Sequence, residues 1–186
     1  MNSKKYKFIL IGAVVLALSL LGYFLISDQE VESIELSLEQ LKSDEAYQFG
    51  EAEWGMSINE LKDKLSCTLI EDSSKSGAPQ EYAFYKSKNP FVLDGQHGET
   101  SFEFHDNKLQ IIKFSFNLDE NHEEWYTAQI EELVKLYGIQ SDKTEATPMG
   151  YNSVNHKWIA GDTMLQVTLM TGEGKTPYVM IAIGKI

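Results

Sequence analysis

An uninterrupted apolar run, Phe8–Ile26, constrains this chain more than any other stretch of its sequence. Its nineteen residues carry no charge, and only Ser19 is clearly polar. As a helix with a rise of about 1.5 Å per residue, the run would be roughly 28 Å long, which is close to the hydrocarbon thickness of a bilayer. The sequence therefore predicts a transmembrane anchor over residues 8–26.

The charges on either side of this run give it a direction. Three lysines precede it, and four acidic residues follow it between positions 28 and 35. Because positive charge stays on the cytoplasmic side, residues 1–7 are predicted to be a cytoplasmic tail and the rest to lie outside, as in a single-pass protein of the cell membrane. A cleaved signal peptide is the alternative. Cleavage after the small-x-small triplet Ala17-Leu18-Ser19 would leave apolar Leu20–Ile26 as the new terminus, so the uncleaved signal-anchor is preferred.

The part of the chain beyond the run is strongly acidic. The whole chain carries a net charge of −12, and the three leading lysines belong to the tail, which leaves 13 lysines and 28 acidic residues, a net charge of −15. The sequence contains no arginine. Nucleic-acid binding needs a basic face, and phosphate recognition commonly uses the guanidinium fork. Nucleic acid is therefore not an expected partner.

Residues 27–48 are predicted to form an acidic helical stalk. Val31, Ile34, Leu38 and Leu41 recur at spacings of three, four and three, which places them on one face of a helix. Two heptads are fewer than a coiled coil needs, so the stalk either lies on its own domain or forms the seam of a homodimer.

A single domain is predicted over residues 49–186, with two helices. Ser57 and Glu60 have the spacing of a capping box and predict a short helix over 58–65. Asn121 and Glu124 have the same spacing, and Gly138 is a natural stop for a second helix that ends at Tyr137. Cys67 is the only cysteine, so no internal disulfide can form; a buried core residue is favoured over an intermolecular bridge.

The remaining patterns predict strands. Alternating or continuous apolar runs indicate strands over 67–71, 81–86, 99–105, 109–116, 156–160, 164–170 and 177–183, the last of them central in a sheet. Leu109 and Ile111 fall on the opposite face from Ile112, which indicates a bulge or a strand covered on both sides. The order of elements predicts an α+β fold of two helices on one face of an antiparallel sheet, arranged as a tandem helix-plus-meander repeat.

Several short motifs resemble those of small bacterial envelope domains. They are Trp54-Gly55-Met56-Ser57, the hairpin FEFHDNKLQIIKF (residues 102–114), Tyr137-Gly138 and Trp158. Together they are similar to the beta-lactamase-inhibitor-like and outer-membrane-assembly lipoprotein group. The resemblance implies a tandem helix-plus-sheet domain that binds or assembles proteins and is not an enzyme. This chain has an apolar run in place of a lipidated cysteine, and no functional residues carry over.

The motifs of common catalytic and metal sites are incomplete. Residues 172–176, GEGKT, end like a phosphate loop, but Leu169 stands where the first glycine is needed, so a hairpin turn is predicted. The four histidines, at 97, 105, 122 and 156, have no helical metal-binding spacing. The sequence therefore identifies no catalytic, cofactor-binding or metal-binding residue.

The stretch YAFYKSKNPF, residues 82–91, has two interpretations. Lys86 and Lys88, with Tyr85 and Phe91, could form a contact surface for a protein or a wall polymer, or they could protect an edge strand. The function predicted from the sequence is a membrane-anchored, extracytoplasmic, non-catalytic protein-interaction module with an envelope or secreted protein as its partner. The alternative is an envelope hydrolase whose active site is assembled from loops.

Overall fold

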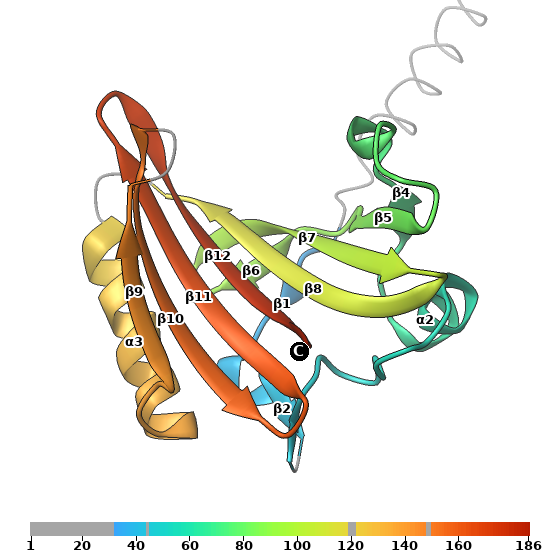
Figure 1. The fold of residues 1–186 in the computed structure, drawn as a ribbon, viewed down its shortest axis with the longest axis horizontal. Coiled ribbons are helices and arrows are strands. Elements are labelled where there is room, and N and C mark those ends of the chain that lie inside the picture. Colours follow the sequence, from blue (N-terminus) through green and yellow to red (C-terminus); the bar gives the residue numbers. More distant parts are fainter. Residues whose placement is uncertain (1–31, 44, 119–121, 148–149) are drawn as a thin grey trace, which may run out of the picture. The chain divides into compact units, whose positions relative to one another are not determined.

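The computed structural model describes residues 32–186 apart from 44, 119–121 and 148–149 (Figure 1). The chain divides into two units, and the second, Glu32–Ile186, contains all the described residues. Most of this unit is strand. Its helical elements are the 3₁₀ turns η1 (Leu38–Leu41) and η2 (Ser73–Lys75) and the α-helices α2 (Ile58–Lys64) and α3 (His122–Tyr137). Its strands are β1 (Ile34–Glu35), β2 (Lys42–Ser43), β3 (Ala46–Tyr47), β4 (Leu69–Glu71), β5 (Tyr82–Ser87), β6 (Phe91–Leu93), β7 (Gln96–His105), β8 (Lys108–Asn117), β9 (Asp142–Ala146), β10 (Asn152–Ala160), β11 (Thr163–Gly172) and β12 (Lys175–Lys185).

One ten-stranded sheet organises the unit (Figure 1). Its main path runs β1-β6-β7-β8-β12-β11-β10-β9, and β5 pairs with both β4 and β7. The pairing of β1 with β6 is parallel, and the other pairings are antiparallel. The strands β2 and β3 form a separate small hairpin.

The predicted α+β fold with a tandem helix-plus-meander repeat is wrong. Strands β8 and β12 pair over seven residues, from Asn117 opposite Tyr178 to Ile111 opposite Gly184. This pairing joins the strands before α3 to those after it in one continuous sheet, so the two halves are not separate layers. Two α-helices of 7 and 16 residues occur in the described part of the chain, and the unit is mainly β.

The membrane-spanning prediction is also corrected. The predicted anchor, Phe8–Ile26, lies outside the described residues. Across residues 32–186, with the gaps given above, no helix is long and apolar enough to cross a membrane. The longest described helix, α3, has 16 residues and begins with acidic side chains, whereas a spanning helix needs about 20 mostly apolar residues. The described residues therefore give no support to the single-pass, signal-anchor assignment or to the location derived from it.

The described part of the predicted stalk does not form a long helix. Residues 32–47 instead contain β1, η1, β2 and β3, and Leu36, Leu38, Leu41 and Tyr47 are buried in the core. Leu38 and Leu41 share a face because they are three residues apart in a single 3₁₀ turn. The spacing that suggested a helical stripe therefore reflects one short turn that packs against the sheet.

Several local signals in the rest of the sequence are confirmed, whereas Asn121, the start of the second predicted capping box, lies outside the described residues. The Ser57 hydroxyl accepts from the amide of Glu60, and the Glu60 carboxylate accepts from the amide of Ser57, which completes the capping box. Helix α3 ends at Tyr137, and Gly138 follows with a φ of +82°. The bulge predicted in the hairpin is present: Glu103 lies opposite Ile111 and Phe104 opposite Leu109, so β8 has one extra residue.

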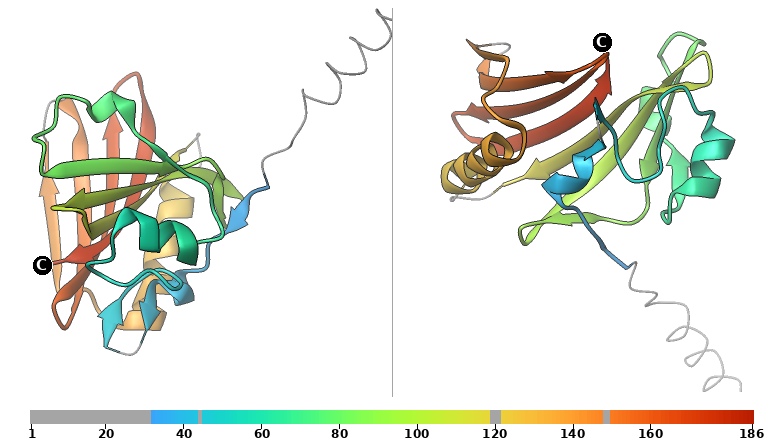
Figure 2. Two further views of the ribbon diagram at one scale, coloured as in Figure 1. Left: turned by 90° about the vertical axis from the view of Figure 1, so that its right-hand side faces the viewer. Right: turned by 90° about the horizontal axis from the view of Figure 1, so that it is seen from below.

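The core fills the space between one sheet face and the elements packed on it. Figure 2 shows α3 and the segment from β1 to β3 on the same side of β10–β12. Phe49 packs edge-on against Phe114 with ring centroids 5.1 Å apart, and Trp125 of α3 lies 5.2 Å from Phe116. The opposite sheet face has no α-helix packed on it in the described residues.

Candidate functional site

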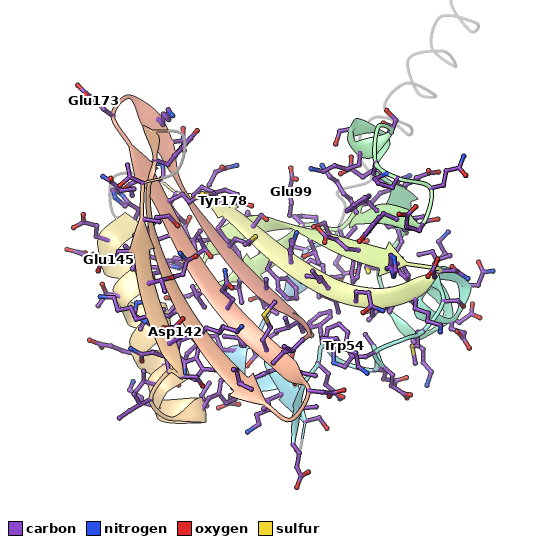
Figure 3. The ribbon with its side chains drawn as sticks, in the orientation of Figure 1. Trp54, Glu99, Asp142, Glu145, Glu173 and Tyr178 are labelled. Carbon is purple, nitrogen blue, oxygen red and sulfur yellow. The ribbon has the colours of Figure 1, made fainter. Side chains whose placement is uncertain are left out.

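The sheet face away from α3 carries a row of mainly polar side chains. Residues directly opposite each other in paired strands share a face. The register places five such residues in line across five strands: Glu99, Ser115, Met180, Thr168 and Asn155. We call the side chains on this side of β5, β7, β8, β12, β11 and β10 the open face. Glu99 and Tyr178, labelled in Figure 3, both belong to it.

A hollow of about 340 Å³ lies in the open face. Strands β5, β7, β8 and β12 form its floor, and the η2 turn borders it. Its lining includes three lysines and three carboxylates, at positions 75, 86 and 113 and at positions 72, 99 and 103. The chain has a net charge of −12, whereas positive and negative side chains are equal in number in the lining of the hollow.

Lys86 connects two carboxylates at one side of the hollow. Its Nζ lies 3.6 Å from Asp72 and 3.8 Å from Glu99. Asp72 also accepts a hydrogen bond of 2.6 Å from the Ser74 hydroxyl, and this bond, followed by the Ser74 amide and Lys86, holds the pKa of the Asp72 carboxyl below its usual value against the effect of partial desolvation. The Glu99 side chain is 78% exposed, so its contact with Lys86 is open to exchange.

The floor of the hollow is more tightly paired. Lys113 of β8 donates a hydrogen bond to Glu103 of β7, and both side chains are largely buried. The hydroxyls of Ser115 and Tyr178 lie 2.8 Å apart and share a hydrogen bond between β8 and β12. These contacts hold the floor in place while Lys86 and Glu99 remain accessible above it.

The open face continues over β10 and β11 as a network of neutral polar groups. The Thr168 hydroxyl donates to the Asn155 side-chain oxygen at 2.7 Å, and the Gln166 amide donates to Thr168 at 3.1 Å. The Asn155 amide in turn donates to Ser153 at 3.2 Å. The face therefore changes from charged on β5, β7 and β8 to mainly neutral and hydrogen-bonding on β10 and β11, where Lys157, opposite Gln166, carries a charge.

The residues that line the hollow are suited to binding. Within the described residues, no group of three or more His, Cys, Asp or Glu side chains could hold a metal ion. No histidine or cysteine lines the hollow, and the hydroxyl of Ser115 pairs with Tyr178. Acyl transfer from a serine needs a base beside its hydroxyl, and the hydrogen-bond partner of the Ser115 hydroxyl is Tyr178. The hollow can bind through hydrogen bonds, ion pairs and the apolar surfaces of Phe84 and Met180.

The residues of the stretch YAFYKSKNPF lie in two different environments. Strand β5 pairs with β4 on one side and β7 on the other, so it is not an edge strand. Phe84 and Lys86 line the hollow, whereas Phe91 is 1% exposed and belongs to the core. Lys86 is therefore accessible to a contacting molecule, as the contact-surface interpretation requires, whereas Phe91 is buried and cannot contribute to such a surface.

The sequence reasoning missed most of the hollow. Glu99 and Lys113 were not singled out because they are ordinary polar residues on alternating strands, and Tyr178 was not because it begins an apolar run. The available signal was the alternation itself, with Glu99, Ser101 and Glu103 spaced by two along β7. Alternation shows that these residues face away from the core, but it does not show that β12 lies beside β8.

The other residues weighed from sequence lie elsewhere. Cys67 is buried, and burial raises the pKa of its thiol. The GEGKT stretch is the hairpin turn between β11 and β12, where Lys175 Nζ lies 3.6 Å from the centroid of the Tyr151 ring. The turn is followed by a strand, as predicted, and not by the helix of a phosphate loop.

The fold and the hollow define an antiparallel-sheet protein with one covered face and one open polar face. Comparison with known families, with curated proteins and with solved structures gives no match.

Proposed function

We propose that this chain is a non-catalytic protein-binding module that holds an extended segment of a partner protein on its open face. The observation that carries the proposal is the hollow over β5, β7, β8 and β12, where accessible charges stand above a fixed, hydrogen-bonded floor. The resemblance noted from the Trp54-Gly55-Met56-Ser57 motif favours the same class of function, and it stays a prediction.

The ion pair between Lys86 and Glu99 at the rim of the hollow is suited to exchange. Its atoms lie 3.8 Å apart and the two side chains are 38% and 78% exposed, whereas the Asp72 side chain, the other partner of Lys86, is 9% exposed. An exposed ion pair of this kind stabilises the fold by only about 0–1 kcal/mol. A partner's carboxylate can therefore replace Glu99 beside Lys86 at little cost to the stability of the module.

The charge balance of the hollow favours a partner segment that carries both signs. Most of the surface of this acidic chain repels other acidic proteins, whereas the lining of the hollow contains three lysines and three carboxylates. Charges in such a place set register and suppress wrong partners. Phe84, Tyr178 and Met180 add the apolar contact that an interface core needs.

The test combines site-specific crosslinking with charge reversal. A photoreactive residue in place of Ser101, on the floor of the hollow, should crosslink to a protein in cells that express the chain. Binding of that protein should weaken by about tenfold or more for Lys86→Glu, because a like charge is placed among Asp72, Glu99 and Glu103.

Lys64→Glu is the matched control. Lys64 lies 3.7 Å from Glu51, its side chain is 45% exposed, and neither residue lines the hollow. Binding should be unchanged in this variant. Equal loss of binding in both variants, or full binding by Lys86→Glu, would reject the open face as the binding surface.

A further inference from the structure

The interface between α3 and the sheet contains buried polar atoms that are not satisfied. Among the described residues, His156 Nδ1, the Tyr126 hydroxyl and Trp125 Nε1 have no hydrogen-bond partner. The three residues are 8%, 7% and 9% exposed. A buried polar group without a hydrogen-bond partner is destabilising. The packing of aromatic side chains in this interface therefore has to offset the free-energy cost of these unpaired polar atoms.

His156 occupies a specific position in this interface. Its ring lies between Tyr126 of α3, with centroids 6.1 Å apart, and Trp158 of β10, at 6.2 Å in a stacked arrangement. Lys143 of β9 is its direct neighbour across the β9–β10 pair, and Glu145 is the next residue on that face of β9. Its neighbour on β11 is Val167, which carries no charge.

We propose that His156 makes the packing of α3 on β10 sensitive to acid, so that protonation of its imidazole loosens the N-terminal half of α3 from the sheet. This inference concerns the covered face and is independent of the binding proposed for the open face. The C-terminal end of α3 is held separately, because Trp158 Nε1 donates to the Gly138 carbonyl at 2.9 Å and the Tyr137 hydroxyl donates to the Leu38 carbonyl.

The direction of the effect follows from the surroundings of the imidazole. Burial, and next the charge of Lys143, lower the pKa of His156, while Glu145 acts in the opposite sense. Tyr126, the titratable group that faces it from α3, is neutral near pH 7, and burial raises its pKa further, to about 12. The packed state therefore binds fewer protons than the loosened state, in which an imidazole has a pKa of about 6.5. As pH falls below that value, the free energy of the loosened state falls relative to that of the packed state, so the loosened state becomes more populated.

Amide hydrogen exchange tests the proposal in the full chain. Between about pH 7.5 and about pH 5, after correction for intrinsic exchange rates, amides of residues 123–130 should lose protection by roughly threefold or more. Amides of the β7–β8 hairpin should keep theirs. Equal loss in both regions would indicate global destabilisation and would reject a local response, as would unchanged protection in α3.

Three variants and one titration sharpen the test. Lys143→Met removes the neighbouring cation from an exposed position and should reduce the acid-induced loss in α3, whereas His105→Asn, at the exposed β7–β8 turn, should leave it unchanged. His156→Phe should abolish the loss. NMR titration of the His156 imidazole in the unmodified chain does not depend on whether any variant folds. A pKa at or above the ordinary value would overturn the proposal.

Discussion

Trp158 and Gly138 are joined by a hydrogen bond of 2.9 Å from the indole Nε1 to the backbone carbonyl. Gly138 is the first residue after α3, and its φ of +82° turns the chain out of the helix. Carbonyls at a helix C-terminus lack intrahelical partners, so the indole satisfies one that would otherwise be left near the core. A single side chain of β10 thereby fixes where α3 ends on the sheet.

Replacing Trp158 with Phe should lower the free energy of unfolding by about 1–3 kcal/mol, because the Gly138 carbonyl loses its donor and the smaller ring leaves space in the core. Urea denaturation monitored by circular dichroism measures this. A loss below about 0.5 kcal/mol would show that solvent satisfies the carbonyl equally well.

Tyr126, which is buried, and Tyr137, which is partly buried, should respond oppositely to the loss of their hydroxyls. Tyr126→Phe removes a hydroxyl that has no partner among the described residues and should leave the free energy of unfolding unchanged or raise it. Tyr137→Phe removes the bond to the Leu38 carbonyl and should lower it by about 0.5–1.5 kcal/mol. Parallel denaturant titrations compare the pair, and equal destabilisation would contradict the assignment of partners.

The pKa values of the same two tyrosines predict that the fold loses stability at alkaline pH. Burial raises the pKa of Tyr126 to about 12, and burial, with smaller contributions from Tyr47 and Glu39, raises that of Tyr137 to about 12. The folded chain therefore keeps protons that the unfolded chain loses above about pH 10. Stability should be intact below about pH 10 and fall as pH rises towards 12. Thermal unfolding across this range should show a smaller fall in Tyr126→Phe than in the unmodified chain.

Gly98 of β7 should not tolerate a side chain. A Cβ there would lie 2.6 Å from Phe116 Cε1 and 2.9 Å from the carbonyl oxygen of Ser115. Gly98→Ala should therefore lower the free energy of unfolding by about 1–3 kcal/mol through overpacking. Gly77→Ala is the control, since nothing lies within 4 Å of its Cβ position, and it should change stability by less than about 0.5 kcal/mol.

Leu133 and Ile139 test the orientation of α3. Leu133 is fully buried under the helix, whereas Ile139, just beyond its end, is 84% exposed. Leu133→Ala should cost about 2–5 kcal/mol, and Ile139→Ala should cost less than about 0.5 kcal/mol. Similar values for the two variants would mean that α3 packs on a different face.

Local chemistry was readable from the sequence. The capping box of Ser57 and Glu60, the stop at Gly138 and the bulge between β7 and β8 each depend on residues within a few positions of one another. The apolar character of Tyr178–Ile183 also predicted that β12 is central, and β12 lies between β8 and β11.

The pairing of strands that are far apart in the sequence could not be predicted from it. The alternation of Lys113, Ser115 and Asn117 shows which side of β8 is polar, but it does not specify that β12 is the neighbouring strand. The predicted repeat placed β8 and β12 in separate halves, and the predicted stalk helix missed the burial of Leu38 and Leu41 because a 3₁₀ turn shares the three-residue spacing of a helix.

The sequence by itself determined the caps, turns and alternating strands of this protein, since these depend on backbone geometry and neighbouring side chains. Only the tertiary structure decided that β8 and β12 lie side by side, which brings Ser115 to Tyr178 across 63 positions and forms the floor of the hollow. The physical reason is that a strand exposes the same backbone donors and acceptors along its length, so the choice of neighbour depends on how the whole apolar face is buried at once.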